Sequence, residues 1–224
     1  MSPLIPVIIL GSGGHALVIW DILESLRQFN VIGFTDPLTP RGTVRTLGKE
    51  RRPILGDDNV LDEYLAKEEN LHVIAGMGPE PEHIRKTAIA KIASFGRERL
   101  LTVIHPSTSI SASVRLGHGT VIMAGAVVNP NTSIGNHCVV NTGATVDHEC
   151  EIQDNVFIQP GAHVAGRVVV EEDAIVGIGA GIREKVRIGR RAFVGGGAFV
   201  ARDIPPGAVV VGVPARVLRY RAEK

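Results

Sequence analysis

The chain is poor in aromatic residues and in cysteine, and it carries almost no net charge. Phe, Trp and Tyr make up 4% of its 224 residues, there are two cysteines, and 24 Lys and Arg against 23 Asp and Glu leave a net charge of +1. Two cysteines are too few for a disulfide framework. A charge of +1 creates no field that would draw the protein to nucleic acid or to an acidic membrane surface.

Long apolar runs are also missing. No stretch approaches the roughly 18 consecutive apolar residues that cross a membrane. The short apolar run at 7–10 follows no basic segment and precedes no cleavage site, so we expect a cytoplasmic protein that does not contact the membrane. A core of this size usually contains more aromatic side chains, and a repetitive arrangement of aliphatic ones must therefore fill it.

The second half of the chain has an aliphatic residue at every sixth position. From Ile104 to Val200, seventeen consecutive positions spaced by six hold Ile, Leu or Val, which together occupy 65 of the 224 positions. Chance would give such a series in roughly one case in a billion, so we interpret it as the signature of a hexapeptide-repeat β-helix. An ordinary β-sandwich would not keep one register over about a hundred residues.

Each six-residue unit provides a short strand and a turn. Because side chains alternate between the two faces of a strand, the aliphatic residue and the small residue four positions later, such as Ala126 or Cys150, both point inward. Gly and Asn recur directly after the aliphatic residue, as at Gly117 and Asn141, and we expect the positive φ angles of the turns there. No insertion interrupts the run, so the prism is predicted to lack a protruding loop.

Residues 1–103 show the alternation that is typical of an α/β unit. Strands are predicted at 7–10, 31–34, 71–75 and 101–104, and helices at 16–26 and 81–95. Gly11, Gly13 and Ala16 match the G-x-G-x-x-G/A pattern, whose glycines allow a tight turn before a helix N-terminus that binds anions. About four strands are too few for a full dinucleotide-binding domain, which favours a nucleoside-diphosphate ligand over a nicotinamide dinucleotide.

We therefore expect two domains, a Rossmann-like α/β unit at 1–103 and a parallel β-helix with a C-terminal tail at 104–224. Several segments of the two together resemble one family. They are Gly11-Ser-Gly-Gly-His15, Gly33-Phe-Thr-Asp36, Ile54-Leu-Gly-Asp57, Ile104-His-Pro-Ser107, Asn141-Thr-Gly-Ala-Thr-Val-Asp-His-Glu-Cys150 and the tail at 203–216.

In combination these segments are similar to the sialic acid O-acetyltransferase family of hexapeptide-repeat acyltransferases, and within it to the branch that acetylates the 4-amino group of nucleotide-linked sugars. The resemblance implies a left-handed parallel β-helix with three hexads in each coil, so that equivalent residues of successive coils are stacked. It further implies acetyl-CoA as the co-substrate, a nucleotide-linked amino sugar as the acceptor, and a homotrimer whose active sites lie between neighbouring β-helices.

The resemblance also implies roles for individual residues. The catalytic base matches His148 and its helper carboxylate Glu149. The positions that hold the sugar nucleotide match Gly13, Gly14, His15, Asp36 and Gly56, and the contact to the sugar itself matches Asn141. The acetyl-CoA contacts match Phe157, Gly166, Ile178 and Gly196. This chain departs from the family at position 157, often a histidine, because phenylalanine donates no hydrogen bond, and at the acidic pair after the second strand, which here is Thr35-Asp36.

The residue types at 148 and 149 suit acetyl transfer for chemical reasons. Attack of an amine on a thioester needs a base for the amine proton, and imidazole titrates in the useful range. A carboxylate on the other ring nitrogen fixes the tautomer and stabilises the imidazolium. Gly166 lies one coil above His148, and its missing side chain is expected to leave room for substrate. If the base is not His148, the next candidate is His15.

We expect no metal site. A γ-class carbonic anhydrase shares the β-helix but needs three histidine ligands, two of them close in sequence, and no two histidines of the repeat lie within ten residues of each other. Two alternatives to an amino-sugar N-acetyltransferase remain open. One is an O-acetyltransferase of sialic acid or a related sugar, and the other is a non-catalytic sugar-nucleotide-binding protein.

Overall fold

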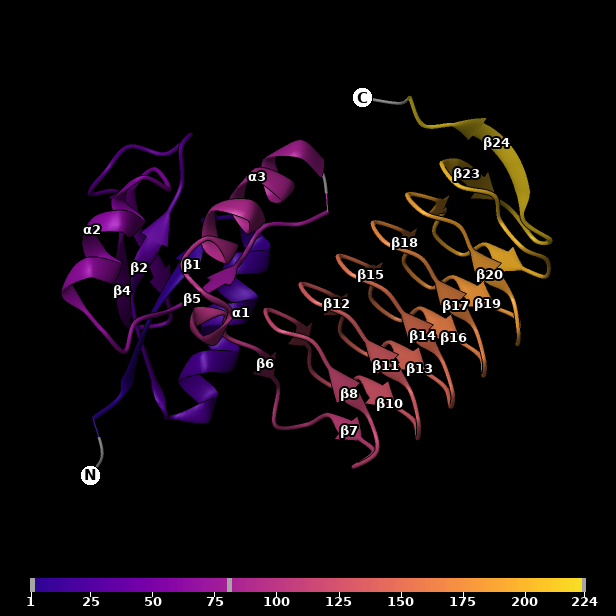
Figure 1. Cartoon of the computed structure of the whole chain (residues 1–224), viewed down its shortest axis with the longest axis horizontal. Coiled ribbons are helices and arrows are strands. Elements are labelled where there is room, and N and C mark those ends of the chain that lie inside the picture. The colour runs from indigo at the N-terminus through magenta and orange to yellow at the C-terminus, as the bar shows by residue number, and fades with distance from the viewer. Residues whose placement is uncertain (1–2, 80–81, 223–224) are drawn as a thin grey trace. The chain divides into compact units, whose positions relative to one another are not determined.

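The computed structural model describes residues 3–79 and 82–222, and the chain forms two compact units, Met1–Val103 and Ile104–Lys224 (Figure 1). In the first unit the sheet order is β3-β4-β2-β1-β5, with every neighbouring pair parallel except the antiparallel β3 and β4. The strands are β1 (Ile5–Leu10), β2 (Phe29–Thr35), β3 (Val44–Leu47), β4 (Glu50–Gly56) and β5 (His72–Ala75). The helices are α1 (Gly14–Leu26), α2 (Val60–Lys67) and α3 (Glu82–Ala93), followed by a short 3-10 helix at Arg97–Arg99.

The apolar run that predicted β1 is the centre of this sheet. Val7 to Leu10 are completely buried, and α1 contributes Trp20, whose ring meets Phe34 of β2 edge-on at a centroid distance of 5.5 Å. The β3–β4 hairpin and α2 were not predicted, because charged residues interrupt the apolar pattern of those segments. The strand expected at 101–104 as part of this unit is wrong in its extent. Leu100 forms a single parallel bridge to Val73 of β5 and the Leu101 N–H donates to the Val73 carbonyl at 3.0 Å, whereas Val103–Ile104 belongs to a sheet of the β-helix.

The second unit consists of three parallel sheets, which we number I, II and III. Sheet I contains β6 (Val103–Ile104), β9 (Val121–Ile122), β12 (Val139–Val140), β15 (Phe157–Ile158), β18 (Ile175–Val176) and β21 (Phe193–Val194), extended by β23 (Ala208–Val211) and the antiparallel β24 (Arg216–Tyr220). Sheet II contains β7 (Ser109–Ile110), β10 (Val127–Val128), β13 (Thr145–Val146), β16 (His163–Val164), β19 (Gly181–Ile182) and β22 (Phe199–Val200). Sheet III contains β8 (Arg115–Leu116), β11 (Ser133–Ile134), β14 (Glu151–Ile152), β17 (Val169–Val170) and β20 (Arg187–Ile188).

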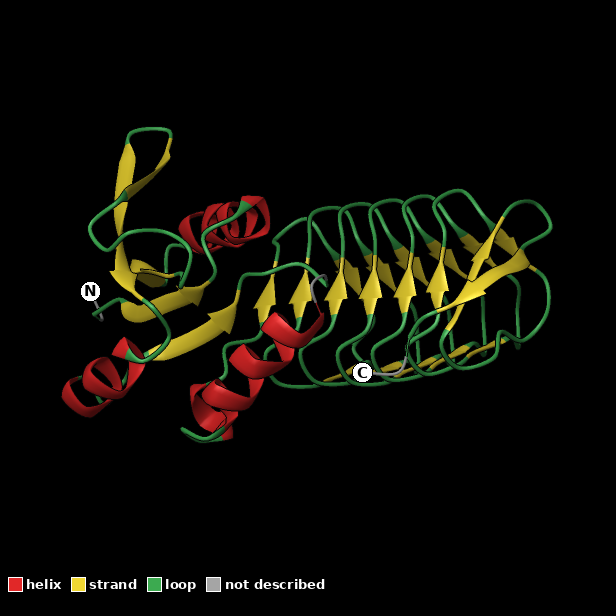
Figure 2. Cartoon of the chain, turned by 90° about the horizontal axis from the view of Figure 1, so that it is seen from above, coloured by secondary structure: helices red, strands yellow, loops and turns green. Residues whose placement is uncertain are grey.

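Successive strands in the chain belong to sheets I, II and III in turn, and each strand pairs with the equivalent strand of the next coil, as Val128 does with Val146. Figure 2 shows these coils stacked along the unit. The aliphatic residue and the small residue of nearly every hexad lie together in one buried core. The predicted fold class is confirmed: an α/β unit is followed by stacked parallel sheets consistent with a left-handed β-helix.

The turns differ from the expectation in one respect. The positive φ angles occur three residues after the aliphatic residue, at glycines such as Gly143 and also at His137, Glu149 and Arg167. The glycines directly after the aliphatic residue have a different cause. A Cβ at Gly117 would lie 2.4 Å from the carbonyl carbon of Gly135 in the next coil, so glycine is needed there because the backbones approach each other closely.

Candidate active site

The turns between sheets form three corners of the prism, which we name by the sheets they join. His148 and Glu149 lie on corner II–III, in the turn between β13 and β14, and both side chains are about half exposed, at 49% and 45%. The His148 Nδ1 is 3.0 Å from the Glu149 Oε2. A carboxylate accepts a hydrogen bond from the protonated Nδ1, so Nε2 carries the lone pair that a general base needs.

Glu149 has a second partner, which residue type alone did not reveal. Arg167, one coil above it, donates from Nε to the same Oε2 at 2.9 Å. The hydrogen bond from Arg167 and, after it, the one from His148 lower the pKa of the Glu149 carboxyl, so that it is ionised at neutral pH. The spacing of one full coil between Glu149 and Arg167 is the signal that could have revealed this pair.

Asp147 shapes the turn that carries the imidazole. Its Oδ1 accepts the backbone N–H of His148 at 2.8 Å and the Nδ2 of Asn129, one coil below, at 2.9 Å. These hydrogen bonds, in that order, hold the pKa of Asp147 below its usual value. The carboxylate of Asp147 is therefore engaged with the turn, and that of Glu149 is the one bonded to the ring.

Gly166 stands beside the imidazole, as its position one coil above His148 predicts. The expectation that its missing side chain leaves room for substrate is wrong, because the imidazole itself occupies that space. A Cβ at Gly166 would lie 2.7 Å from the His148 Nε2 and 2.8 Å from its Cε1. Glycine at 166 is therefore required for the ring to lie against the next coil.

The other predicted residues of the β-helix lie elsewhere on the prism. Asn141, Ile178 and Gly196 are on corner I–II, where Ile178 is 61% exposed and a Cβ at Gly196 would lie 3.2 Å from the Ile178 carbonyl oxygen. The Asn141 Oδ1 accepts the backbone N–H of Thr142 at 2.8 Å.

Phe157 belongs to β15 of sheet I and is buried, with 3% of its surface exposed. Sheet I is the side of the prism opposite corner II–III. One β-helix therefore does not bring Phe157 or the residues of corner I–II together with His148.

In the first unit the predicted residues gather at the carboxyl ends of the strands. Gly13 caps α1 and Gly14 begins it. A Cβ at either position would meet nothing within 4 Å, so packing does not require glycine there. Gly11, just before them, has a φ of 86°, which favours glycine. The first turn of α1 thus carries no side chain at 13 and 14 and has no side-chain cap, and a helix N-terminus of this kind suits a phosphate.

Asp36 follows β2 at the same edge of the sheet. Burial alone would raise the pKa of its carboxyl, but hydrogen bonds from the Ser12 hydroxyl and from backbone and side-chain donors of the following turn outweigh burial and lower it. The backbone N–H of Asp36 donates to the carbonyl of Gly56 at 2.8 Å, which joins the ends of β2 and β4.

Thr35 stands where the family often has a second acidic residue, and its hydroxyl binds the carboxyl of another residue. Its Oγ1 donates to the Oδ1 of Asp58 at 2.5 Å. Burial raises the pKa of Asp58, the hydrogen bond from Thr35 opposes this rise, and the charges of Asp57 and, after it, Asp36 add to it. A second carboxyl therefore lies near Asp36, supplied by the segment that leads into α2, where the sequence had not indicated one.

His15 lies in the first turn of α1. Burial and, to a smaller extent, the charge of Arg85 lower its pKa to about 4. A histidine with that pKa is neutral at pH 7 and is a weak base. His15 is therefore a poor substitute for His148 as the group that accepts a proton, although a neutral ring still offers a hydrogen bond to a ligand.

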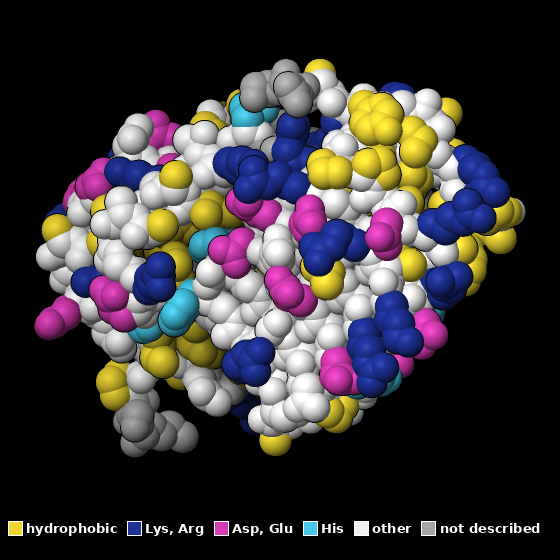
Figure 3. Space-filling view, turned by 45° about the vertical axis from the view of Figure 1, so that its right-hand side comes forward, with side chains coloured by type: hydrophobic (Ala, Val, Ile, Leu, Met, Phe, Trp, Pro, Cys, Tyr) yellow, Lys and Arg dark blue, Asp and Glu magenta, His cyan; other side chains and the backbone are white. Residues whose placement is uncertain are grey.

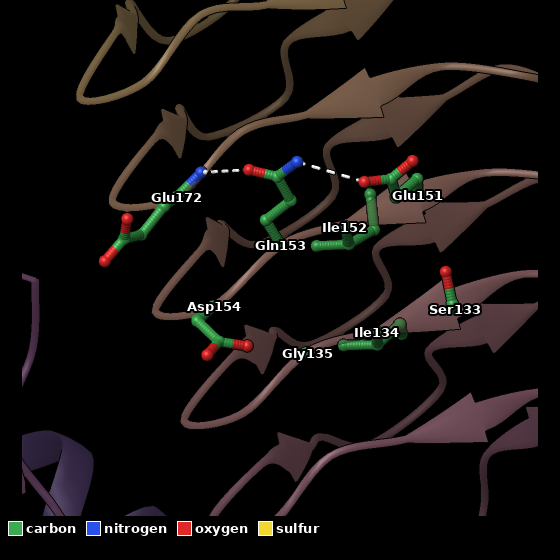
Figure 4. A pocket seen from close by; sticks show the side chains of 8 residues that line it. All are labelled: Ser133, Ile134, Gly135, Glu151, Ile152, Gln153, Asp154 and Glu172. Atoms are coloured by element: carbon green, nitrogen blue, oxygen red, sulfur yellow. Dashed lines mark hydrogen bonds between the residues drawn. The ribbon is translucent and has the colours of Figure 1, made fainter.

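A separate groove of about 480 Å³ runs over sheet III and corner III–I (Figure 4). Its polar lining is held together internally, because Gln153 donates to Glu151 at 3.0 Å and accepts the backbone N–H of Glu172 at 3.2 Å. None of the predicted site residues lines it. Across residues 3–79 and 82–222, no group of three or more His, Cys, Asp or Glu side chains is placed to hold a metal ion, and no helix is long and apolar enough to cross a membrane.

Comparison with protein-family models matches two parts of the chain. Residues 6–92 match the PglD N-terminal domain, and residues 113–148 and 131–166 match the bacterial transferase hexapeptide repeats. A comparison with curated proteins gives no match.

Several solved structures are similar over nearly the whole chain. The acetyltransferase domain of PglB from Neisseria gonorrhoeae is 32% identical, with 96% of this chain and 100% of that one covered and a TM-score of 0.86. A variant of perosamine N-acetyltransferase from Caulobacter crescentus, solved with CoA and GDP-perosamine, is 35% identical, with 95% and 96% covered and a TM-score of 0.85. WeeI from Acinetobacter baumannii is 27% identical, with 95% and 99% covered and a TM-score of 0.80.

The repeat, the α/β unit and the pair at 148 and 149 led to an acyltransferase of this architecture, and the similarity extends over both units. Relatives that are 32% and 35% identical over almost the full length share the family and not merely the fold. The chain belongs to the PglD-like hexapeptide-repeat acetyltransferases.

Proposed function

We propose that the protein transfers an acetyl group from acetyl-CoA to the 4-amino group of a nucleotide-linked deoxysugar, with His148 as the general base. The observation that carries the proposal is the hydrogen bond of 3.0 Å between the His148 Nδ1 and the Glu149 carboxylate. It orients a half-exposed imidazole whose Nε2 has no hydrogen-bond partner among the described residues. An intact pair of this kind argues against a non-catalytic binding protein.

In the proposed step, the sugar nitrogen attacks the thioester carbonyl directly. The new C–N bond forms as the amine proton passes to the His148 Nε2, and the charge of Glu149 stabilises the imidazolium. The C–S bond then breaks, and coenzyme A leaves as a thiolate that takes up a proton. Cys150 has no part in the step, because burial raises the pKa of its thiol and its Sγ donates to the Ala165 carbonyl at 3.2 Å.

We assign the sugar nucleotide to the first unit. Gly13 and Gly14 offer the diphosphate the free N–H groups of α1, His15 offers a neutral ring, and Asp36 with Gly56 borders the same edge of the sheet. The GDP-perosamine and CoA in the Caulobacter crescentus complex support an acceptor of this class. The match to a PglD N-terminal domain over residues 6–92 supports the placement in this unit.

We assign acetyl-CoA to the β-helix, at Phe157, Gly166, Ile178 and Gly196, with Asn141 reaching the sugar. The structure of PglB with acetyl coenzyme A supports this co-substrate. Since Phe157 and corner I–II lie away from His148 within one β-helix, these assignments need a neighbouring chain that brings its corner I–II to corner II–III. This supports the expected homotrimer.

Sheet II lies between those two corners, so the same arrangement turns it toward the three-fold axis. Its outward strand positions carry no charged Asp, Glu, Lys or Arg: Ser109, Val127, Thr145, His163, Gly181 and Phe199. Sheet III, by contrast, presents Arg115, Glu151 and Arg187. Depletion of charge is typical of subunit interfaces.

The face of the molecule that Figure 3 shows has acidic and basic side chains interspersed over it. Hydrophobic side chains gather on this face toward the C-terminal end of the β-helix.

Two measurements test the proposal. The purified protein is incubated with acetyl-CoA and a panel of acceptors, namely UDP-, GDP- and dTDP-linked 4-amino sugars and free sialic acid, and thiol release is followed. Release with a 4-amino nucleotide sugar supports the proposal, release with sialic acid alone establishes O-acetylation, and no release with any acceptor favours a binding protein. Light scattering measures the mass in solution, and a monomer at micromolar concentration would contradict the trimer and the divided site.

A further inference from the structure

We propose that Arg167 is a positioning residue for the catalytic base: it holds the Glu149 carboxylate in place beside His148 and competes with the imidazole for the charge of that carboxylate. The inference rests on the proposed function, since it concerns the base of that reaction. Arg167 was assigned no role by its residue type or by the family pattern. The geometry at corner II–III assigns it one.

One oxygen atom joins the three residues. The Glu149 Oε2 accepts from the His148 Nδ1 at 3.0 Å and from the Arg167 Nε at 2.9 Å. The carboxylate is 45% exposed, and a side chain in that environment samples several rotamers unless a second contact selects one. Arg167 provides that second contact from the next coil, and it selects the rotamer that also reaches the imidazole.

The stacking of the coils makes this contact possible. Glu149 and Arg167 occupy the same place in consecutive turns, both in the left-handed region with φ of 56° and 61°. The two backbones therefore project their side chains in the same direction, one coil apart. Gly166, the residue before Arg167, leaves the space that the imidazole fills, so a single turn houses the ring and fixes its partner.

Arg167 also opposes protonation of the base. The charged groups on the turn of His148 are Asp147 and Glu149, the turn below at 129–132 has none, and the turn above at 165–168 has only Arg167. Arg183, Glu184 and Lys185 lie one coil further away. The cation closest to His148 along this corner is thus Arg167, which is bonded to the same Glu149 oxygen as the imidazole. Its positive charge repels the imidazolium, and its hydrogen bond reduces the stabilisation that the Glu149 carboxylate gives to the imidazolium.

The experiment compares Arg167→Met, Arg167→Lys and a matched control, Arg190→Met. Arg190 forms an equivalent exposed ion pair on corner III–I. Its Nη2 is 2.8 Å from the Oε2 of Glu172, which lies one coil earlier in the chain. Two readouts are collected for each variant. One is the pH profile of kcat/KM for acetyl transfer, and the other is the NMR titration of the His148 ring, assigned with His148→Gln.

We expect Arg167→Met to move the acidic limb of the profile and the His148 titration to higher pH by about half a unit, because one screened positive charge is lost at this range. Glu149 is the next residue in the chain, so its charge stays near the ring although its rotamer is no longer fixed. Its kcat should be about three- to tenfold lower, because the carboxylate is no longer fixed. Arg167→Lys should restore the midpoint of the titration, since it returns the charge. Arg190→Met should match the wild type in both readouts.

An Arg167→Met titration that superimposes on that of the wild type would overturn the proposal, as would an equal shift in Arg190→Met. A raised KM for acetyl-CoA with an unchanged titration would instead make Arg167 a ligand of the co-substrate and would equally refute a positioning role. The NMR titration needs no turnover. If the wild-type protein acetylates none of the acceptors, the proposed function fails while the coupling of Arg167 to His148 is still measured.

Discussion

Replacing Gly166 by alanine tests the geometry of the base without removing any functional group. The added Cβ would lie 2.7 Å from the His148 Nε2, whereas ordinary contacts begin at 3.4 Å, so the ring has to retreat by about 0.7 Å. Gly166 is not among the residues with positive φ. Alanine is therefore compatible with the backbone, and it stabilises the fold by about 0.4–1 kcal/mol through the unfolded chain, which offsets part of the cost of the contact.

The displacement should appear in turnover. A misplacement of about 1 Å can reduce a rate by about 10²-fold, so we expect Gly166→Ala to lower kcat by about 10- to 100-fold with little change in melting temperature. Thiol release from acetyl-CoA with the acceptor that the wild-type protein uses gives kcat and both KM values, and circular dichroism gives the melting temperature.

A double-mutant cycle decides whether the loss arises from His148. In a His148→Ala background the imidazole is gone, so Gly166→Ala should cost nothing further, and the two single effects should be strongly non-additive. Additive effects, or wild-type turnover in Gly166→Ala, would refute the contact. If the loss arises mainly from the acetyl-CoA contact that is also assigned to Gly166, the variant raises the KM for acetyl-CoA, and it does so in both backgrounds.

Three further results are expected. His148→Ala should lower kcat by about 10²- to 10⁴-fold, the usual contribution of a general base, whereas Glu149→Gln should lower it less and Cys150→Ser should leave it unchanged. If His148→Ala retains more than about a tenth of wild-type turnover, the base lies elsewhere. Asp36→Ala should raise the KM for the sugar nucleotide and leave that for acetyl-CoA unchanged, and an equal rise in both would contradict the division of labour between the units. Burial and the charge of Arg85 hold the pKa of His15 at about 4, below 6.5 for the unfolded chain, so the unfolded state takes up the proton first as the pH falls and the free energy of unfolding, full above about pH 6.5, decreases by up to about 3 kcal/mol toward pH 4. Urea unfolding of His15→Gln should show a shallower pH dependence than the wild type. Identical curves would contradict a buried neutral ring.

The sequence was sufficient to predict the β-helix because its period leaves little freedom. Once the aliphatic residues recur every six positions, the strands and their inward faces follow from alternation, and the stacking of successive coils follows from the repeat. The α/β unit was harder to predict. β3 has only four residues and includes Arg45, β4 begins with the exposed Glu50 and Arg51, and α2 is short, so none of the three shows a strong apolar pattern. The predicted number of strands was therefore too low.

The site shows the same division. His148 and Glu149 could be found from residue type and family pattern, and their contact then follows from adjacency in one turn. Arg167 and Asp58 could not, because an arginine in a solvent-facing turn and an aspartate after a strand are common on any surface. Their roles depend on which side chain faces them, across one coil for Arg167 and across the sheet edge for Asp58.

The repeat itself supplies a rule for finding such partners. At corner II–III, Asn129 bonds Asp147, and Glu149 bonds Arg167, each across one coil. Each pair joins residues that occupy the same place in consecutive turns, so the length of one coil determines which side chains can meet. A residue in a turn of this β-helix is thus best judged with the equivalent residues one coil before and one coil after it. By that criterion His148 is defined as much by the glycine at 166, against which its ring lies, as by the carboxylate at 149, and a substitution at either position alters the base while residue 148 itself stays unchanged.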